Sequence, residues 1–311
     1  KFVSRVDQLS IGVYNEAVTF TESSIAPCEL SVQLITKIRE IVRNQASQSG
    51  FACSTVDGLM TVGAATIPLL MKEVQASSAF RVWEVSVCEL QMVDLSGLNE
   101  NEKCLFWINV NNMMTMHRFA RGIIQGAGVF EMTASMRNFK YNVSGYIVSI
   151  MDIEHGILRN CSAKLVIFNT FTSNLGFSEK DPRNALALRV ARPLLSFLLF
   201  QGTSCGPPLV ILTRPANIDE DLLRFSSYYL KKIVRIEKGS GSAFSSSTHT
   251  IFLPDVFKVY MKDFGDTRQA MLAQVSWIVG KGSFSELYEK MLKDKISPKI
   301  SYIPFSFIAS M

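Results

Sequence analysis

The sequence predicts an α+β fold: a mixed or mainly antiparallel central sheet surrounded by helices, with an integral helical N-terminal region. Three observations favour this class. The 311 residues are 48% hydrophobic, which is ample for a sizeable core. Apolar residues recur at helical spacing through much of the first 121 positions. From residue 139 onwards, alternating and short apolar segments bounded by turn residues indicate strands between the helices.

The N-terminal helices are predicted from their first turns and their apolar stripes. Pro27 suits the first turn of a helix, and residues 47–50 end that helix. Ranges 65–76 and 79–93 predict two further helices. The stripe of the first helix lies on one face and consists of Leu30, Leu34, Ile38, Ile41 and Val42.

A helix over residues 100–121 is predicted to lie at the centre of the fold. Asn99 stands three residues before Glu102, which resembles a capping box at a helix start. The helix that follows is apolar almost all round. A helix with this pattern is typically buried on every side.

The second half of the chain alternates between predicted strands and helices. A hairpin is expected at 139–150, a short helix at 151–160, and a flexible loop at 238–248. Further strands are predicted at 193–200, 208–213 and 249–253, further helices at 219–232, 255–265, 267–279 and 283–294, and an extended end at 299–307.

Composition and charge argue against several classes of protein. The formal charge of +5 is mild, and the closest approach to a basic cluster, at 231–238, is interpreted as a solvated face rather than a nucleic-acid site. The longest apolar stretch, 194–200, is far too short to span a membrane. Six scattered cysteines without paired spacing favour free thiols in a reducing compartment, which we expect to be the cytoplasm.

No cofactor or metal is expected. The three histidines lie far apart and no cysteine pair accompanies them, so a zinc site is not predicted. Neither a dinucleotide fingerprint nor a phosphate-binding loop is present. Because the chain begins with Lys, we expect that an upstream portion precedes it. The predicted organisation is an extended strap at 1–26, a helical region at 27–95 packed on the core, and a domain at 96–311.

The segments FWINVNN and IEHGILR lead to a family resemblance. Together with LLSFLLFQGTSCGPPLV, IFLPDVFKVYMKDF and ISYIPFSF, in this order, they resemble the domain-of-unknown-function 547 family over roughly 80–311. The resemblance implies a distant relation to papain-like or transglutaminase-like cysteine hydrolases. It places Cys205 where bacterial-type members have Ser, Gly206 where they have Cys, and Ser196 where they have His. Asn111 replaces a usual Tyr, whereas Glu154 and His155 match the family motif.

Two interpretations of these residues remain open. In the catalytic one, His155 activates the Cys205 thiol, and Asn109 or Glu154 orients the imidazole. In the structural one, Cys205 is a small residue in a tight turn and His155 anchors its own helix. Glu154 and Arg159 would then make internal polar bonds, although a spacing of five does not align two side chains on an α-helix.

The altered order of residues around Cys205 favours the structural interpretation. We therefore predict a non-catalytic interaction or scaffold module within a larger intracellular protein or assembly, a degenerate relative of cysteine hydrolases. The alternative is an active cysteine hydrolase or transferase using Cys205 and His155. Partners are expected to be proteins, which bind an apolar patch or the strap at 1–26, with neither nucleic acid nor a membrane span involved.

Overall fold

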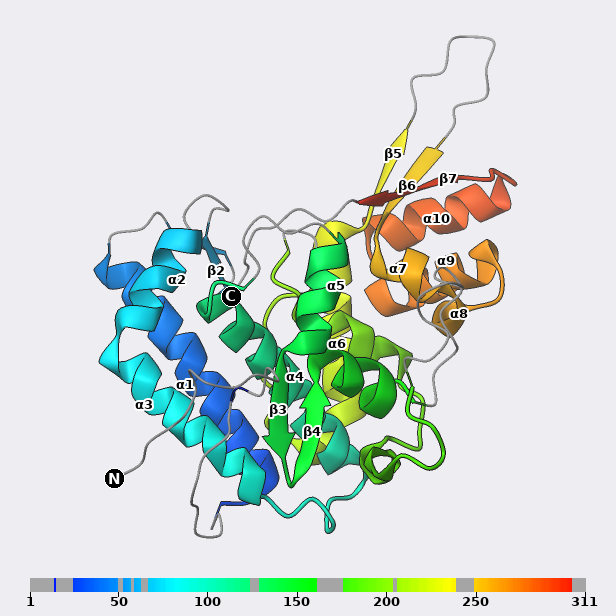
Figure 1. Cartoon of the computed structure of the whole chain (residues 1–311). Coiled ribbons are helices and arrows are strands. Elements are labelled where there is room, and N and C mark those ends of the chain that lie inside the picture. Colours follow the sequence, from blue (N-terminus) through cyan, green and yellow to red (C-terminus); the bar gives the residue numbers. More distant parts are fainter. Residues whose placement is uncertain are drawn as a thin grey trace.

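The computed structural model describes residue 14 and residues 25–49, 53–56, 59–62, 67–123, 129–160, 176–203, 206–238 and 249–303 (Figure 1). The α+β class with an integral helical N-terminal region is confirmed, and the sheets are antiparallel or mixed. The predicted strap at 1–26 and the loop at 239–248 fall almost wholly outside the described residues. Tyr14 is described, and its backbone N–H donates to the carbonyl of Lys140 at 2.8 Å.

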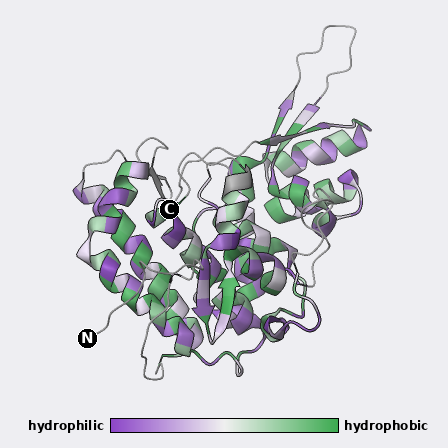
Figure 2. Cartoon of the chain, in the orientation of Figure 1, coloured by the Kyte–Doolittle hydropathy of each residue, from purple (hydrophilic) through white to green (hydrophobic). Residues whose placement is uncertain are grey.

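Three helices form the N-terminal region, as predicted. They are α1 (Pro27–Gln48), α2 (Ile67–Ala76) and α3 (Ser78–Val87), and a 3₁₀ turn, η1 (Cys88–Met92), extends α3. Figure 2 shows both hydrophobic and hydrophilic residues along α1 and α3, as expected for helices with one buried face. The indole N–H of Trp83 on α3 donates to the carbonyl of Leu34 on α1 at 2.9 Å and joins the two helices.

Helix α4 (Glu100–Ala120) lies at the centre of the molecule (Figure 1). It begins at the predicted capping box, because the Asn99 side chain accepts from the Glu102 backbone at 3.1 Å and the Glu102 carboxylate accepts from the Asn99 backbone at 2.9 Å. Every residue from Cys104 to Ala120 is buried. Helices α1 and α2 and several later elements pack on it. The central position expected for a sheet is thus taken by this helix.

The strands of the described residues form three small sheets. Strands β1 (Cys53–Val56) and β2 (Leu59–Val62) form an antiparallel pair that the sequence did not predict. The predicted hairpin at 139–150 is confirmed: it follows α5 (Val129–Asn138) and consists of β3 (Lys140–Val143) and β4 (Tyr146–Ser149). Its two turn residues have positive φ values of 53° at Ser144 and 80° at Gly145, which match a hairpin turn of type I′.

The third sheet belongs to the C-terminal part. Strand β5 (Arg235–Lys238) pairs antiparallel with β6 (His249–Pro254), which pairs in parallel with β7 (Lys299–Ile303). The helices predicted at 219–232, 267–279 and 283–294 are confirmed, whereas the one at 255–265 is divided into two short helices. They are α6 (Ile218–Ile233), α7 (Val256–Val259), α8 (Met261–Phe264), α9 (Arg268–Val279) and α10 (Ser283–Lys293).

The strands predicted at 193–200 and 208–213 are wrong. Residues 193–197 form a 3₁₀ helix, η4 (Pro193–Phe197), and residues 207–214 have no regular structure. Both segments are nevertheless largely buried, so their backbone polar groups need partners that no strand supplies. An apolar run alone does not distinguish a buried strand from other buried backbone.

Asn112 on α4 supplies many of these partners. Its amide nitrogen donates to the carbonyls of Leu198, at 2.9 Å, and Val210, at 3.2 Å. Its amide oxygen accepts from the backbone N–H of Phe200 at 2.8 Å. One side chain thus holds two segments of irregular backbone together.

Asn109, one turn earlier on the same face of α4, acts in the same way on Leu212. Its oxygen accepts from the Leu212 N–H at 3.0 Å, and its nitrogen donates to the Leu212 carbonyl at 2.8 Å. This arrangement copies the paired bonds that one strand residue gives another in an antiparallel ladder. The two asparagines therefore do for this region what a neighbouring strand would do.

We expect the substitution Asn112→Ala to destabilise the fold by at least about 3 kcal/mol, because it leaves buried backbone groups of 198, 200 and 210 without partners, at about 1–3 kcal/mol each. Urea unfolding measures the change. The matched control is Asn138→Ala at an exposed position, which should change stability by less than about 0.5 kcal/mol. Equal effects of the two variants would show that the asparagine bonds do not hold this region.

Candidate functional site

The IEH element lies in a π-helix, η2 (Asp152–Leu158), directly after β4. At its start, the Asp152 carboxylate accepts from the backbone N–H of Ser149 at 2.8 Å and from its hydroxyl at 2.7 Å. At its end, the backbone N–H of Arg159 donates to the carbonyl of Glu154 at 3.0 Å, a bond over five residues. Helical turns of this kind are rare and frequently mark functional sites.

Glu154 and Arg159 meet at one tyrosine. The hydroxyl of Tyr260 donates to the Glu154 carboxylate at 2.5 Å. The guanidinium of Arg159 lies over the ring of Tyr260, 3.7 Å from its centroid. The spacing of five separates two side chains on an α-helix, but here it spans one hydrogen-bonded turn of a π-helix, so both reach the same ring.

Arg159 also forms a buried ion pair. Its guanidinium lies 2.5 Å from the carboxylate of Asp263 on α8, with only 3% and 2% of the two side chains exposed. A second nitrogen donates to the Ser196 hydroxyl on η4 at 2.8 Å. Ser196 is the position at which the family resemblance places a bacterial histidine. In this chain it is a partner of an arginine, and the polar network joins η2, η4 and α8.

The charge state of Tyr260 follows from its surroundings. Burial raises the pKa of the Tyr260 phenol well above its usual range, and the adjacent Glu154 carboxylate raises it further. The hydroxyl therefore keeps its proton at neutral pH. It acts as a donor to Glu154 and not as a base.

His155 lies in the middle of η2 and is partly exposed. Burial of the ring lowers the pKa of His155 below its usual value; the Glu154 carboxylate partly offsets this and Arg159 adds to it. The imidazole is 6.4 Å from the Tyr260 ring, between centroids, and tilted by 49°. Among the described residues its nitrogens have no hydrogen-bond partner in the structure. The ring is thus neutral at pH 7.

The other predicted site residues do not converge on His155. Both amide atoms of Asn109 are engaged by Leu212, and the nitrogen also reaches the Ser31 hydroxyl at 3.4 Å. Cys205 lies outside the described residues, so its pairing with His155 stays a prediction. The two described residues that flank its loop are joined, since the N–H of Gly206 donates to the carbonyl of Thr203 at 3.2 Å.

One face of η2 is covered by residues 177–183. A side-chain carbon at Gly156 would stand only 2.6 Å from the ring of Phe177, so this glycine permits the ring to lie directly on the helix. The guanidinium of Arg183 lies over that ring, 4.3 Å from its centroid. This cover therefore depends on the absence of a side chain at 156.

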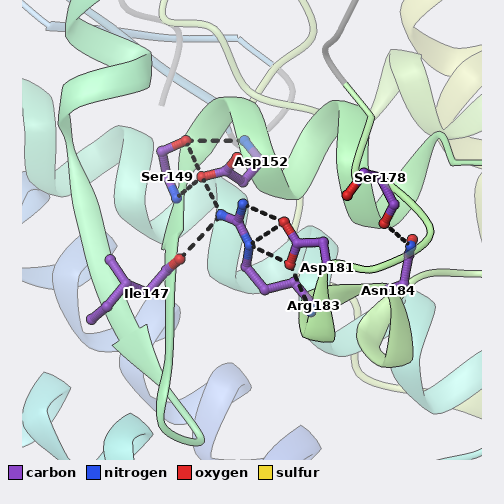
Figure 3. Close-up of polar contacts among 7 residues, drawn as sticks. All are labelled: Ile147, Ser149, Asp152, Ser178, Asp181, Arg183 and Asn184. Carbon is purple, nitrogen blue, oxygen red and sulfur yellow. Dashed lines mark hydrogen bonds and ion pairs between the residues drawn. The ribbon is translucent and has the colours of Figure 1, made fainter.

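Arg183 is itself held in place by charges, as Figure 3 shows. Its Nε donates to Oδ1 of Asp181 at 3.0 Å and its Nη2 donates to Oδ2 at 2.8 Å, while its Nη1 lies 3.3 Å from Asp152 at the start of η2. It also donates to the carbonyl of Ile147 on β4 at 3.4 Å. Arg183 therefore connects the segment 177–183 to both β4 and η2.

A second buried polar cluster surrounds His117 on α4. Its Nε2 lies 2.8 Å from the Glu84 carboxylate and its Nδ1 lies 2.6 Å from the Tyr141 hydroxyl. Burial lowers the pKa of His117, so the neutral ring donates to Glu84 and accepts from Tyr141. Arg121 also pairs with Glu84. Sequence reasoning missed Glu84 and Tyr141, because neither spacing nor motif links them to His117.

In the described part of the chain, no group of three His, Cys, Asp or Glu side chains could hold a metal ion. None of the helices in this part is long and apolar enough to cross a membrane.

The chain is thus an α+β protein built on a buried central helix, beside which a π-helix presents a glutamate and a histidine. Residues 95–230 match the family described as "Protein of unknown function, DUF547". Neither the curated proteins nor the solved structures contain a significant match. The relation to papain-like hydrolases rests on the sequence resemblance alone.

The bond between Tyr260 and Glu154 can be tested by a double-mutant cycle. Tyr260→Phe should lower the free energy of unfolding by about 1.5–3 kcal/mol, because a hydrogen bond to a buried charged group is lost. Combined with Glu154→Gln, it should cost much less than the sum of the two single variants. Tyr146→Phe on β4 is the control and should have little effect; strict additivity would contradict the assigned bond.

The lowered pKa of His155 predicts how acid affects the fold. The unfolded imidazole, with a pKa of about 6.5, binds a proton more tightly than the folded one. The stability that His155 contributes is therefore present above about pH 6.5 and is lost as the pH falls below that value. Ring-nitrogen NMR, assigned with His155→Gln, should give a pKa below about 6.5. A higher value would indicate an anionic partner such as a thiolate.

Proposed function

We propose that this domain is a non-catalytic interaction or scaffold module, related to cysteine hydrolases but without their chemistry. One observation carries the proposal: the two polar groups that would orient His155 have other partners. Asn109 is bonded to the backbone of Leu212, and Glu154 accepts from Tyr260. A cysteine nucleophile needs a base that is itself held by a third group. The described residues give His155 no such group.

The electrostatics of His155 support the same proposal. A catalytic thiolate is stabilised by a neighbouring imidazolium, and each charge raises the other's stability. The pKa of His155 is instead lowered by burial. A neutral imidazole at pH 7 does little to hold a thiolate in place.

The polar network has a structural use that suits a scaffold. Arg159, Asp263 and Ser196 come from three elements that are far apart in the sequence, and their bonds fix those elements relative to one another. A rigid framework of this kind lowers the entropy that a binding surface loses when a partner docks. We propose proteins as those partners.

The alternative function is an active cysteine hydrolase or transferase that uses Cys205 and His155. It is favoured by the π-helix at His155 and by the intermediate exposure of that residue. No described residue forms a hydrogen bond with the imidazole nitrogens. A ligand or the Cys205 thiol would then complete the site. This alternative makes a different prediction for the reactivity of the thiol.

The remaining sequence predictions are kept as proposals. The thiols of Cys28, Cys88 and Cys104 are free, which supports a reducing compartment, and we propose the cytoplasm. We also propose the division at residues 26 and 95. The contact between α1 and α4 supports the N-terminal helices as a part of the same core.

The rate of alkylation of Cys205 by iodoacetamide tests the proposed function. We expect a rate that rises with pH as for an ordinary thiol of pKa about 8.5 or higher, and that changes by less than about twofold in His155→Asn. Peptide mass mapping separates Cys205 from the other thiols. Burial raises the pKa of Cys28 and Cys88 to about 11, so these two are slow internal references.

The enzyme alternative predicts the opposite result. Fast alkylation near pH 6, with a loss of tenfold or more in His155→Asn, would show a thiolate paired with this imidazole and would overturn the scaffold proposal. A change in Asn138→Ala, which lies at an exposed position, would instead indicate a general effect on the fold.

A further inference from the structure

Helix α9 has an exposed face that carries a tryptophan and no charge. Its buried residues, Met271, Leu272, Val275, Ile278 and Val279, face the rest of the domain. Its exposed positions include Ala270, Ala273, Gln274 and Trp277, which recur at helical spacing along one side. Trp277 is 61% exposed, more than any other large hydrophobic residue that the structure describes.

Exposed cations lie on α9 and on the neighbouring helices. Lys258 on α7, Lys262 on α8 and Arg268 at the start of α9 are exposed, as is Lys281 just after its end. The three helices are in contact in the order α7, α8, α9. Only one carboxylate in this stretch, Asp266, is exposed, because the Asp263 side chain is buried against Arg159.

The net charge of the chain arises in the C-terminal part, to which α7–α9 belong. Residues 231–311 hold twelve Lys and Arg and seven Asp and Glu, which accounts for the full formal charge of +5. Residues 1–230 hold twenty of each and are neutral. The family match ends at residue 230, so this positively charged C-terminal part lies outside the matched segment.

We propose that the α7–α9 surface, defined as Lys258, Lys262, Arg268, Trp277 and Lys281, docks on a membrane surface that contains anionic lipid headgroups. An exposed indole prefers the boundary between headgroups and acyl chains, where its ring is buried and its N–H stays hydrated. Each nearby Lys or Arg attracts anionic lipid and raises the affinity about fivefold. The protein would rest on the surface and not cross it.

The small apolar area favours a bilayer over a protein partner. Between residues 249 and 282, Trp277 is the one large hydrophobic side chain with high exposure. A specific protein interface of standard size covers about 800 Å² on each side and is centred on a cluster of buried anchors. One exposed indole, on contacting helices that also carry exposed cations, matches an interfacial anchor instead. Figure 1 places α7–α9 on the side of the molecule opposite α1–α3, so the N-terminal helices stay free for other contacts.

Vesicle sedimentation with the full chain tests this proposal. The probes are vesicles of phosphatidylcholine alone and vesicles with a minor fraction of phosphatidylserine, at low and at high salt. We expect binding to the anionic vesicles only, and loss of binding at high salt because the attraction is screened. Tryptophan fluorescence should shift to the blue. That shift reports on Trp277, since Trp83 and Trp107 are 0% and 1% exposed in the free protein.

Matched variants separate the indole from the charges. Trp277→Ala should lower the bound fraction several-fold, whereas Val82→Ala, at a position on α3 that is 58% exposed, should not. Replacing Lys258, Lys262 and Lys281 by Gln should weaken binding at least tenfold. The same change at Lys37, Lys72 and Lys180, which are exposed elsewhere and remove an equal charge, should have a much smaller effect.

Three results would overturn the proposal. They are no binding of the unmodified chain to anionic vesicles, equal binding to neutral ones, and binding that survives both sets of substitutions. If Trp277→Ala abolishes self-association in solution and vesicles are not bound, the surface is a contact between copies of this chain. None of these results depends on the reactivity of Cys205, so the scaffold proposal and this one fail separately.

Discussion

The burial of α4 is the constraint on which the rest of the fold depends. A helix with every residue from Cys104 to Ala120 enclosed is shielded from water, so its polar side chains depend on partners inside the protein. Asn109 and Asn112 find theirs in the backbone of 198–212, and His117 finds Glu84 and Tyr141. The same bonds satisfy the irregular segments, which would otherwise bury unpaired backbone groups. The polar side chains of α4 and the irregular backbone around it thus supply each other's hydrogen-bond partners.

The buried charges around η2 add a second constraint. The pair of Arg159 and Asp263 costs desolvation energy that its own attraction offsets only when the geometry is good and the remaining donors are used. Ser196 and the Tyr260 ring use them. A network of this kind fixes one arrangement of η2, η4 and α8 more than it adds stability. Within the same network, the Glu154 carboxylate accepts from the Tyr260 hydroxyl.

The sequence predicted the elements that carry local signals. The capping box at Asn99, the hairpin around Gly145 and the helices with clear stripes follow from interactions within a few residues. The segments at 193–200 and 208–213 were assigned wrongly because their apolar runs report burial and not backbone geometry. The polar network around Tyr260 could not be predicted from the sequence for another reason. Tyr260 stands 106 residues from Glu154, and no spacing rule links positions so far apart. The catalytic pair of Cys205 and His155 stays a prediction from the resemblance.

A glutamate–histidine motif beside a cysteine loop invites a catalytic interpretation, yet the same residues are needed where no chemistry takes place. Glu154 anchors Tyr260, and the arginine five residues later anchors α8 and η4. Asn109 is needed to replace a strand. A chain that lost its nucleophile would keep all three for packing alone. The presence of the motif is therefore weak evidence for an enzyme, and the groups that hold the imidazole are the stronger criterion. By that criterion the described residues form a framework, and the exposed features that call for a partner lie elsewhere, on α7–α9.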